Sequence, residues 1–373
     1  MMRYTFFLFL VLYAPTLIAQ PVPSHDNNRL IEFPDIPGYQ TITCDFHIHT
    51  VFSDGYVWPG IRVQEALKDG VDAISLTEHL EYQPHAEDIP HADRNRSYQI
   101  AEENARAHNL IVVRGSEITR NMPPGHNNAI FIQDANKLLI KDSIEVFREA
   151  NRQGGFVFWN HPNWIAQTKD GIAKLTDMHR MLINEDLLHG IEVVNEFTYS
   201  DEALQIALDH NLTIMGTSDV HGLIDWDYHV HEGGHRPVTL VFAEERTQEA
   251  IKDGLMERRT VVWHNNQLIG REEWLVPLLN ACLSVEKVQY MGAASVLQVF
   301  LKNESDMEFI LTNESGYTLH DGVGVIQVLP HATTKIEFKT REQLDTVDLK
   351  LRVLNAVSAP NINPTIEKKV VLP

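Results

Sequence analysis

Two histidines stand one residue apart at the end of an apolar run, in the segment CDFHIHTVFSDG at residues 44–55. Side chains at positions i and i+2 of a strand point to the same side, so His47 and His49 are expected to converge on one point. Two converging imidazoles suit a metal ion. An isolated HxH segment, however, is more often part of a solvated strand face. The choice between a metal site and a solvated face therefore depends on other residues of the chain.

Further histidines and carboxylates end other apolar runs or stand in the loops after them. In a parallel βα barrel such strand ends share one rim, where the active sites of barrels lie. One polar residue at a strand end is usually unremarkable, but a set at nearly every strand end predicts a metal centre. Imidazole and carboxylate ligands without cysteine favour two or three divalent ions of zinc, manganese or iron over a structural zinc site. The candidate metal ligands are His47, His49, Asp54, His79, Glu117, His126, His161, Asp219 and His221.

The segments that would position these residues alternate between strand-like and helix-like patterns. Such alternation predicts parallel βα units in a barrel or a doubly wound sheet. No strand is followed by a GxGxxG or GxxxxGK loop, which favours the barrel over a nucleotide-binding sheet. Strands are expected at 41–49, 71–79, 110–119, 126–133, 155–162, 190–196, 213–221, 237–244 and 260–265. Helices are expected at 59–70, 96–109, 142–154, 201–211 and 247–259.

The pattern changes at about Glu273, where short alternating runs separated by Asn, Gly, Ser and Pro begin. Runs of this kind are typical of an antiparallel β-sandwich. We therefore expect the barrel at 41–268 and a small C-terminal antiparallel β-sandwich at 275–373. The sandwich segment contains few histidines and no carboxylate cluster, which indicates a packing or positioning role.

The composition is that of an ordinary globular chain of 373 residues, long enough for two domains. With 31 basic and 51 acidic residues the formal net charge is −20, which argues against nucleic acid or an anionic membrane as a partner. The only cysteines are Cys44 and Cys282, and two separate buried thiols are favoured over a single disulfide bridge.

The N-terminus has the pattern of a secretory signal peptide. Arg3 precedes an apolar stretch from Phe6 to Tyr13, and Pro15 interrupts the run before it is long enough to span a membrane. We expect a signal peptide at 1–19, a Pro-rich N-terminal extension at 20–40, no membrane insertion, and a secreted or periplasmic mature protein.

The HxH near the start, the SDG loop, the TEH, the later Glu and His residues and the closing SDVH together resemble the PHP (polymerase and histidinol phosphatase) family. The resemblance covers residues 41–268 and implies a distorted (β/α)7 barrel that commonly holds three metals. Many members have His where this chain has Asp54. Carried over to this sequence, the first metal would be bound by His47, His49, Asp219 and bridging Glu117. The second would be bound by Asp54, His79 and His221, and the third by Glu117, His126 and His161.

A site that holds several divalent cations would be positively charged and would attract a phosphate group. Two neighbouring ions can also activate a bridging water for attack on phosphorus. We therefore predict a phosphoric ester hydrolase that uses a metal-bridging hydroxide and acts on a small-molecule phosphate ester. Arg120 and Arg236 are candidate phosphate-binding residues, each with an ordinary surface ion pair as the alternative. The candidate proton donors to the leaving group are His229, His231 and His235.

Four further residues bear on this chemistry. Trp164, Trp226 and Tyr228 are candidates to line a pocket for an apolar ester arm, with packing under a loop as the default reading. Glu78 could orient a ligand imidazole or cap a helix.

Secretion, the appended β domain and the overall pattern resemble bacterial PHP phosphodiesterases that act on organophosphate diesters, so a phosphodiesterase is the main prediction. The alternatives are a phosphomonoesterase of the histidinol-phosphatase type and a catalytically inactive barrel with a carbohydrate- or polymer-binding sandwich. The sequence does not indicate the oligomeric state.

Overall fold

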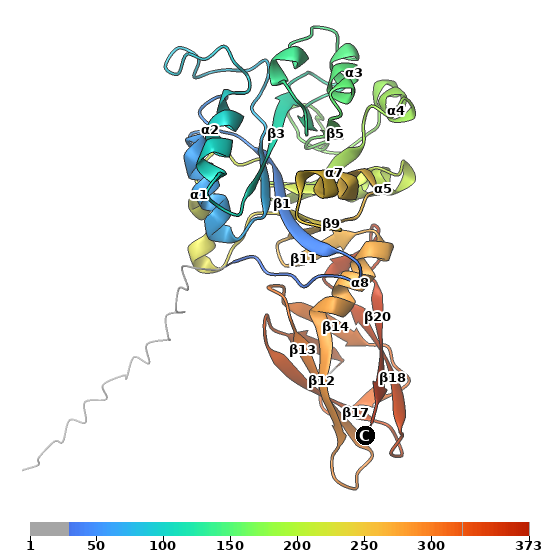
Figure 1. Ribbon diagram of the computed structural model, residues 1–373. Coiled ribbons are helices and arrows are strands. Elements are labelled where there is room, and N and C mark those ends of the chain that lie inside the picture. The colour runs from blue at the N-terminus through green and yellow to red at the C-terminus, as the bar shows by residue number, and fades with distance from the viewer. Residues whose placement is uncertain (1–29, 323, 373) are drawn as a thin grey trace, which may run out of the picture.

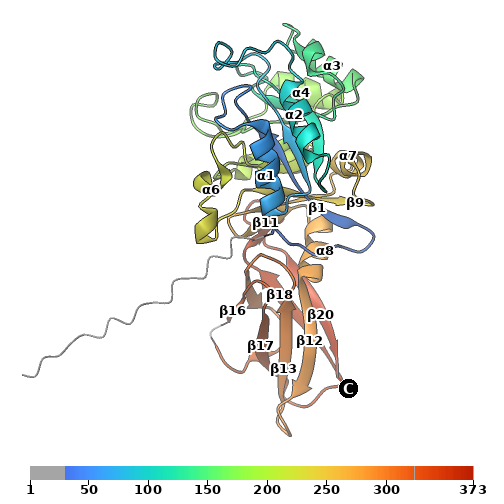
Figure 2. The same ribbon diagram turned by 60° about the vertical axis from the view of Figure 1, so that its left-hand side comes forward.

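The computed structural model describes residues 30–322 and 324–372, which form two regions stacked end to end (Figures 1 and 2). The predicted signal peptide lies outside the described residues, as does the first part of the predicted N-terminal extension. Within the described ranges, no helix is both long enough and apolar enough to cross a bilayer.

The first region is built on a curled sheet of twelve strands. Strands β1, β2 and β3 pair in parallel, as do β5, β6 and β8, while β4, β9 and β10 pair antiparallel with their neighbours. The sheet curls round until β8 meets β1 and β9. The strands are β1 (Gln40–Ile48), β2 (Ala73–Leu76), β3 (Ile111–Ile118), β4 (Asn127–Ile130), β5 (Phe156–Trp159), β6 (Gly190–Asn195), β7 (Thr198–Tyr199), β8 (Thr213–Thr217), β9 (Val238–Ala243), β10 (Thr260–His264) and β11 (Gln267–Gly270).

Two hydrogen bonds join β8 and the residues after it to β1 and β9. The His49 amide donates to Val220 O at 3.1 Å, and the Gly216 amide donates to Thr239 Oγ1 at 2.9 Å. The predicted distorted barrel is therefore confirmed. It departs from a uniform parallel barrel because β4 follows β3 after a short connection that has no room for a crossover helix.

Helices cover the outside of the sheet and begin and end where the sequence supplies caps. Helix α1 has Pro59 at its first turn and ends at Gly70 in the left-handed conformation (φ 74°). Ser200 and Thr247 cap α5 and α7 by accepting backbone hydrogen bonds from Ala203 and Ala250. The helices are α1 (Pro59–Asp69), α2 (Arg96–Ala105), α3 (Glu145–Arg152), α4 (Asp177–Asn184), α5 (Asp201–Asp209), α6 (Ile224–Asp227), α7 (Gln248–Met256) and α8 (Glu272–Cys282), with short 3₁₀ helices η1 (Ala135–Leu138) and η2 (Val230–Glu232).

Three helices were not predicted from the sequence: α4, α8 and the four-residue helix α6. Helix α4 spans only eight residues, too few to show a clear helical period, although Thr176 forms a capping box with His179. Helix α8 contains Pro277 in its interior, and an interior proline in a sequence predicts a break in the helix. As a result, the first residues of the range assigned to the sandwich, 275–282, are helical.

The second region consists of two four-stranded antiparallel sheets, in the orders β12-β13-β17-β15 and β16-β14-β18-β20. Their inward side chains alternate with outward polar ones, so the predicted β-sandwich is confirmed. The strands are β12 (Leu283–Tyr290), β13 (Val296–Asn303), β14 (Phe309–Asn313), β15 (Thr318–Leu319), β16 (Val325–Val328), β17 (Thr333–Lys339), β18 (Thr346–Val353) and β20 (Thr365–Val371).

One short strand of the C-terminal segment belongs to the barrel. Strand β19 (Ala356–Val357) pairs in parallel with β11 and is the last strand of the twelve-stranded sheet. The Asn355 side chain donates to Asn266 O at 2.9 Å and extends this connection. Apolar side chains of both regions form one continuous core. Cys44 and Cys282 are buried and free, as predicted.

Candidate metal centre

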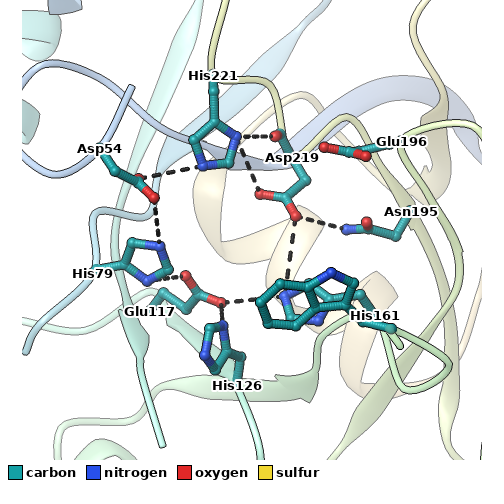
Figure 3. Close-up of a pocket in the computed structure, with 10 residues that line it drawn as sticks. Asp54, His79, Glu117, His126, His161, Asn195, Glu196, Asp219 and His221 are labelled. Atoms are coloured by element: carbon teal, nitrogen blue, oxygen red, sulfur yellow. Dashed lines mark hydrogen bonds and ion pairs between the residues drawn. The ribbon is translucent and has the colours of Figure 1, made fainter. Parts of the chain in front are cut away.

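The nine candidate ligands lie together at the mouth of the barrel, beside a pocket of about 160 Å³. Figure 3 shows those that line the pocket, which are all of them except His47 and His49. They come from the ends of strands or from the loops that follow, so side chains far apart in sequence share one rim. The residues that line the pocket are Asp54, His79, Glu117, His126, His161, Trp164, Asn195, Glu196, Asp219 and His221.

The first group of ligand atoms consists of His47, His49 and Asp219. Asp219 Oδ1 lies 3.1 Å from His47 Nε2 and 3.0 Å from His49 Nε2, and the two imidazole nitrogens are 3.1 Å apart. His47 is the penultimate residue of β1 and His49 is the residue after the strand, and both imidazoles are fully buried. The convergence expected from the HxH spacing is therefore present.

The second group consists of His49, Asp54, His79 and His221. Asp54 approaches His79 Nε2 and His221 Nε2 at 3.2 Å each, through its two different oxygens. The His49 ring stacks on the His221 ring with centroids 4.4 Å apart. His49 thus lies between the first two groups, whereas the family resemblance places it with the first metal alone.

The third group is centred on Glu117, which is fully buried. Its Oε2 lies 2.5 Å from His79 Nδ1, and its Oε1 lies 2.9 Å from His126 Nδ1 and 3.6 Å from His161 Nε2. Glu117 also approaches His47 and His49 at 3.8 and 3.6 Å. This central position is the one expected of a bridging carboxylate.

The donor atoms fit divalent cations. Asp54 Oδ1, Glu117 Oε2 and Asp219 Oδ1 are buried and make no hydrogen bond, a situation that costs free energy unless a cation satisfies the oxygen. Imidazole nitrogens and carboxylate oxygens without thiolates are the ligands that catalytic zinc, manganese and iron use. The residues present therefore fit the implied metals.

The backbone is strained at three positions around the pocket. His161, Glu196 and Asp219 have φ values of 29°, 48° and 47°, in the left-handed region that residues with a Cβ rarely adopt. Such strain persists only where the surrounding structure enforces it, and it is commonly found at functional sites. At His161 and Asp219 it turns a candidate ligand toward the pocket directly after a strand.

The metal-free electrostatics favour a mixture of protonated and neutral imidazoles. Burial lowers the pKa of His79, but Glu117 and Asp54 outweigh it and raise that pKa to about 11. For His47, Asp219 and Glu192 likewise outweigh burial and raise the pKa to about 10. Burial dominates at His49 and lowers its pKa to about 3. His49 is therefore a neutral ligand, while protons compete with metal for His47 and His79.

A carboxylate that sequence reasoning missed supports two of the ligands. Glu192, buried in β6, accepts hydrogen bonds from His47 Nδ1 at 2.8 Å, the His161 amide at 2.7 Å and Asn195 Nδ2 at 3.0 Å. The first bond fixes the His47 ring so that Nε2 faces Asp219. The available signal was a single carboxylate within the otherwise apolar strand segment GIEVVN.

Glu78 supports the loop after β1. It accepts hydrogen bonds from Thr50 Oγ1 and Ser53 Oγ at 2.5 Å each, and Ser53 Oγ lies 3.2 Å from His49 Nδ1. Of the two interpretations, orientation of a ligand imidazole therefore matches the observed contacts, through Ser53.

Arg62 was also missed, because it lies within helix α1 and resembles an ordinary surface residue. Its buried guanidinium donates to the backbone carbonyls of His49, Val220, His221 and Gly222 at 2.7–3.1 Å. It thereby joins the two loops that contribute His49 and His221.

Arg236 does not lie in the pocket, contrary to the prediction. Its guanidinium is buried and pairs with Asp69 at 2.7 Å and Asp45 at 3.3 Å. Asp45 in turn accepts a hydrogen bond from Ser218 Oγ at 2.6 Å. Arg236 therefore supports the segment before Asp219 from beneath and cannot reach a phosphate at the mouth.

Arg120 is also engaged elsewhere. Its guanidinium pairs with Glu81 and donates to Ile140 O at 2.6 Å. It lies outside the residues that line the pocket.

The predicted proton donors are placed away from the pocket as well. The His235 ring stacks on Trp263 with centroids 3.5 Å apart and borders a separate small cavity with Arg236. His229 and His231 lie at η2, where His231 approaches Glu232 at 3.6 Å. The loop after His221 runs along α6 away from the pocket, and no sequence pattern predicted this direction.

Of the three predicted aromatic residues, only Trp164 lines the pocket, where its ring lies 5.1 Å from His161 and 5.6 Å from His126. Trp226 is 74% exposed on α6, and Tyr228 is buried with its hydroxyl donating to Ser218 O. Asn195 and Glu196, which were not predicted, complete the lining, and Asn195 donates to Asp219 Oδ2 at 3.2 Å.

The C-terminal region matches a family model described as an Ig-like domain over residues 283–369. No curated protein matches the chain at a significant level.

Among solved structures, a two-domain protein from Bacteroides vulgatus ATCC 8482, described as containing a predicted PHP-like metal-dependent phosphoesterase, is 41% identical. That match covers 92% of this chain and 99% of the other, with a TM-score of 0.85. A putative metal-dependent phosphoesterase from Bifidobacterium adolescentis is 18% identical and covers 49% of this chain and 89% of its own, with a TM-score of 0.39. PsfC from Pseudomonas syringae is 16% identical, with 61% and 92% covered and a TM-score of 0.43.

The Bacteroides match spans both regions at a level of identity that two unrelated chains do not share. It agrees with the resemblance drawn from the HxH, TEH and SDVH segments. The chain therefore belongs to the family of two-domain proteins that contain a PHP-like metal-dependent phosphoesterase.

Proposed function

We propose that this protein is a phosphodiesterase that hydrolyses small-molecule phosphate diesters. The composition of the pocket lining favours a diester over a monoester as the substrate. Among the described residues that line the pocket, none is lysine or arginine, and the two predicted arginines are engaged elsewhere. A dianionic monoester usually requires such fixed cations, whereas a diester carries one negative charge and two substituents.

The nine candidate ligands would hold two to three divalent ions. When bound, such ions supply Lewis-acid stabilisation of the phosphate oxygens and activation of a water molecule. The chain's own contribution is to hold those ligands in place. Glu192 fixes His47, Glu78 fixes the loop before Asp54, and Arg62 joins the loops of His49 and His221.

The rest of the lining would position the substrate. Trp164 offers an apolar wall beside His126 and His161, and Asn195 holds Asp219 in place through a hydrogen bond. The sequence pattern at residues 1–19 supports action outside the cytoplasm, which would keep the enzyme away from cytoplasmic phosphate esters.

The test compares bis(p-nitrophenyl) phosphate with p-nitrophenyl phosphate, using protein loaded with manganese, zinc or iron. We expect a higher kcat/KM for the diester, and the metal that gives the highest activity identifies the preferred ion. Faster turnover of the monoester would favour the phosphomonoesterase. Bound metal without turnover of either ester would favour a binding protein.

A further inference from the structure

One carboxylate in the pocket is left over after the candidate metal ligands are assigned. Glu196 lines the pocket but is in none of the groups of ligand atoms that lie close enough to share a metal ion. It follows β6 at the turn to β7, and its backbone is held in the left-handed conformation (φ 48°). In Figure 3 its side chain lies beside Asn195 and Asp219, facing the same space as the ligands.

Among the described residues that line the pocket around Glu196, none is lysine or arginine. The charged groups that most influence it are Asp219, His221, His161 and His47. Burial and then Asp219 raise the pKa of Glu196, whereas His221, His161 and His47 lower it. A phosphate group held at the ligands would add another negative charge to the same small pocket.

The second residue of interest is Trp164. It lines the same pocket, and 45% of its surface remains exposed although one side contacts His126 and His161. A partly exposed indole and a carboxylate that line one pocket are a combination that can bind an ammonium group, because the ring's negative face and the carboxylate both attract a cation. A neutral arm would also pack against Trp164 but would make no use of the Glu196 carboxylate.

We propose that Glu196 and Trp164 bind a cationic ammonium group carried by one arm of the phosphate diester. The inference rests on the proposed phosphodiesterase function and adds to it a class of substrate, namely diesters of amino alcohols such as choline or ethanolamine. Phosphate at the metal ligands and ammonium at Glu196 would fix the diester at both ends.

The test uses two diesters with the same leaving group and nearly the same shape. They are p-nitrophenyl phosphocholine and p-nitrophenyl 3,3-dimethylbutyl phosphate, in which carbon replaces the quaternary nitrogen. We expect the native protein to prefer the charged ester by about tenfold in kcat/KM, the size of effect that a partly desolvated cation–π contact gives. Equal values for the two esters would overturn the proposal.

Variants assign the preference to these two residues. Glu196→Gln should bring the ratio of the two kcat/KM values close to one, and Trp164→Leu should reduce it. The metal content of each variant should equal that of the native protein. Glu102→Gln, a matched change in the exposed helix α2, should keep the native ratio. An unchanged ratio in Glu196→Gln would overturn the proposal. So would a loss confined to esters with poor alkoxide leaving groups, because Glu196 would then act as a proton donor.

Failure of the proposed function would look different. If metal-loaded protein hydrolyses no diester, including bis(p-nitrophenyl) phosphate, the phosphodiesterase proposal is wrong. Calorimetric binding of phosphocholine and 3,3-dimethylbutyl phosphate then tests the ammonium site without turnover. Tighter binding of phosphocholine that disappears in Glu196→Gln supports the site, and equal binding of both compounds rejects it.

Discussion

In the sandwich, strand β18 alternates exposed and buried residues along its whole length, whereas strand β1 at the barrel is buried on both sides over its last seven residues. The sandwich strand has charged side chains only on its outer face. The barrel strand ends with His47 buried among carboxylates. The two regions share one continuous apolar core, but β18 keeps its charged groups on the surface whereas β1 buries its ionisable groups.

This difference shows where the chain departs from its most stable local structure. At the barrel mouth, ionisable groups are buried and ordinary residues have left-handed backbone, both of which cost stability. Strand β18 bears no such cost, and the left-handed residues His331 and Arg341 of the sandwich lie in exposed turns. We infer that the barrel mouth was shaped by the requirements of a metal site and the sandwich by packing.

The largest expected effect comes from Asp219→Asn. Asp219 Oδ1 contacts both His47 and His49, so neutralising it should remove metal and lower hydrolysis to the background rate. Elemental analysis and a diester assay measure both effects. Asp348→Asn, on the exposed face of β18, is the matched control and should change neither. Full activity with bound metal in Asp219→Asn would remove this residue from the site.

Glu192→Gln should have the next largest effect. The amide cannot accept all of the hydrogen bonds that come from His47, the His161 amide and Asn195. Loss of such a supporting carboxylate typically lowers metal affinity by about 10–100-fold. Metal titration followed by calorimetry measures the change. Native affinity in this variant would show that Glu192 serves packing alone, and the contrast between the two regions would weaken.

A core change in the sandwich should affect stability without affecting the metal. Leu351→Ala removes a side chain that is 1% exposed in β18, at an expected cost of about 2–5 kcal/mol in the free energy of unfolding. Chemical denaturation measures this cost, and metal content per folded molecule should remain native. A parallel loss of metal would show that the two regions are coupled more closely than their polar groups suggest.

The pH dependence of stability should distinguish metal-free from metal-loaded protein. The folded-state pKa values of His221, His47 and His79 are about 9, 10 and 11, above the ordinary value for histidine. Their protonated forms therefore stabilise the metal-free fold below about pH 6.5, and this contribution is lost as the pH rises through 9–11. Melting temperatures measured with and without chelator should diverge over that range. Identical profiles would contradict the assigned charges.

The smallest effect is expected for His231→Ala. His231 lies at η2 and approaches Glu232, outside the pocket lining, so kcat/KM should stay within about twofold of the native value, as for most surface substitutions. A selective loss on esters with alkoxide leaving groups would restore the original prediction for this loop.

Much of the fold could be predicted because most barrel elements carry a clear period and recognisable ends. The segment PGIRVQEALKDG has both its proline start and its glycine end, and α1 follows them closely. Helix α8 was missed because its stabilisation comes from packing against both regions, which overrides Pro277. The pairing of β19 with β11 depends on tertiary contacts that no local pattern records.

Most candidate ligands could be predicted because they lie at or within four residues of the end of a strand, whose direction fixes where its end lies; Asp54 and His126 lie farther along the connecting loops. His229, His231 and His235, predicted as proton donors, are not among the residues that line the pocket, because the sequence of a loop does not fix its direction. Glu192 and Arg62 were overlooked for a different reason. The contacts that tie them to the site span long distances in the chain, 145 positions between Glu192 and His47 and 158 positions between Arg62 and Val220.

The pairing of β19 with β11 also has a consequence for the order of folding. The connection between Asn355 and Asn266 closes a loop of 89 residues, which contains nearly all of the sandwich. The edge of the barrel sheet therefore remains open until the last part of the chain has been synthesised and the sandwich has formed. Contacts of such long sequence separation form slowly, and an unpaired edge is prone to association. We expect the barrel to be most vulnerable to aggregation during this interval, and premature termination of translation to leave it permanently exposed.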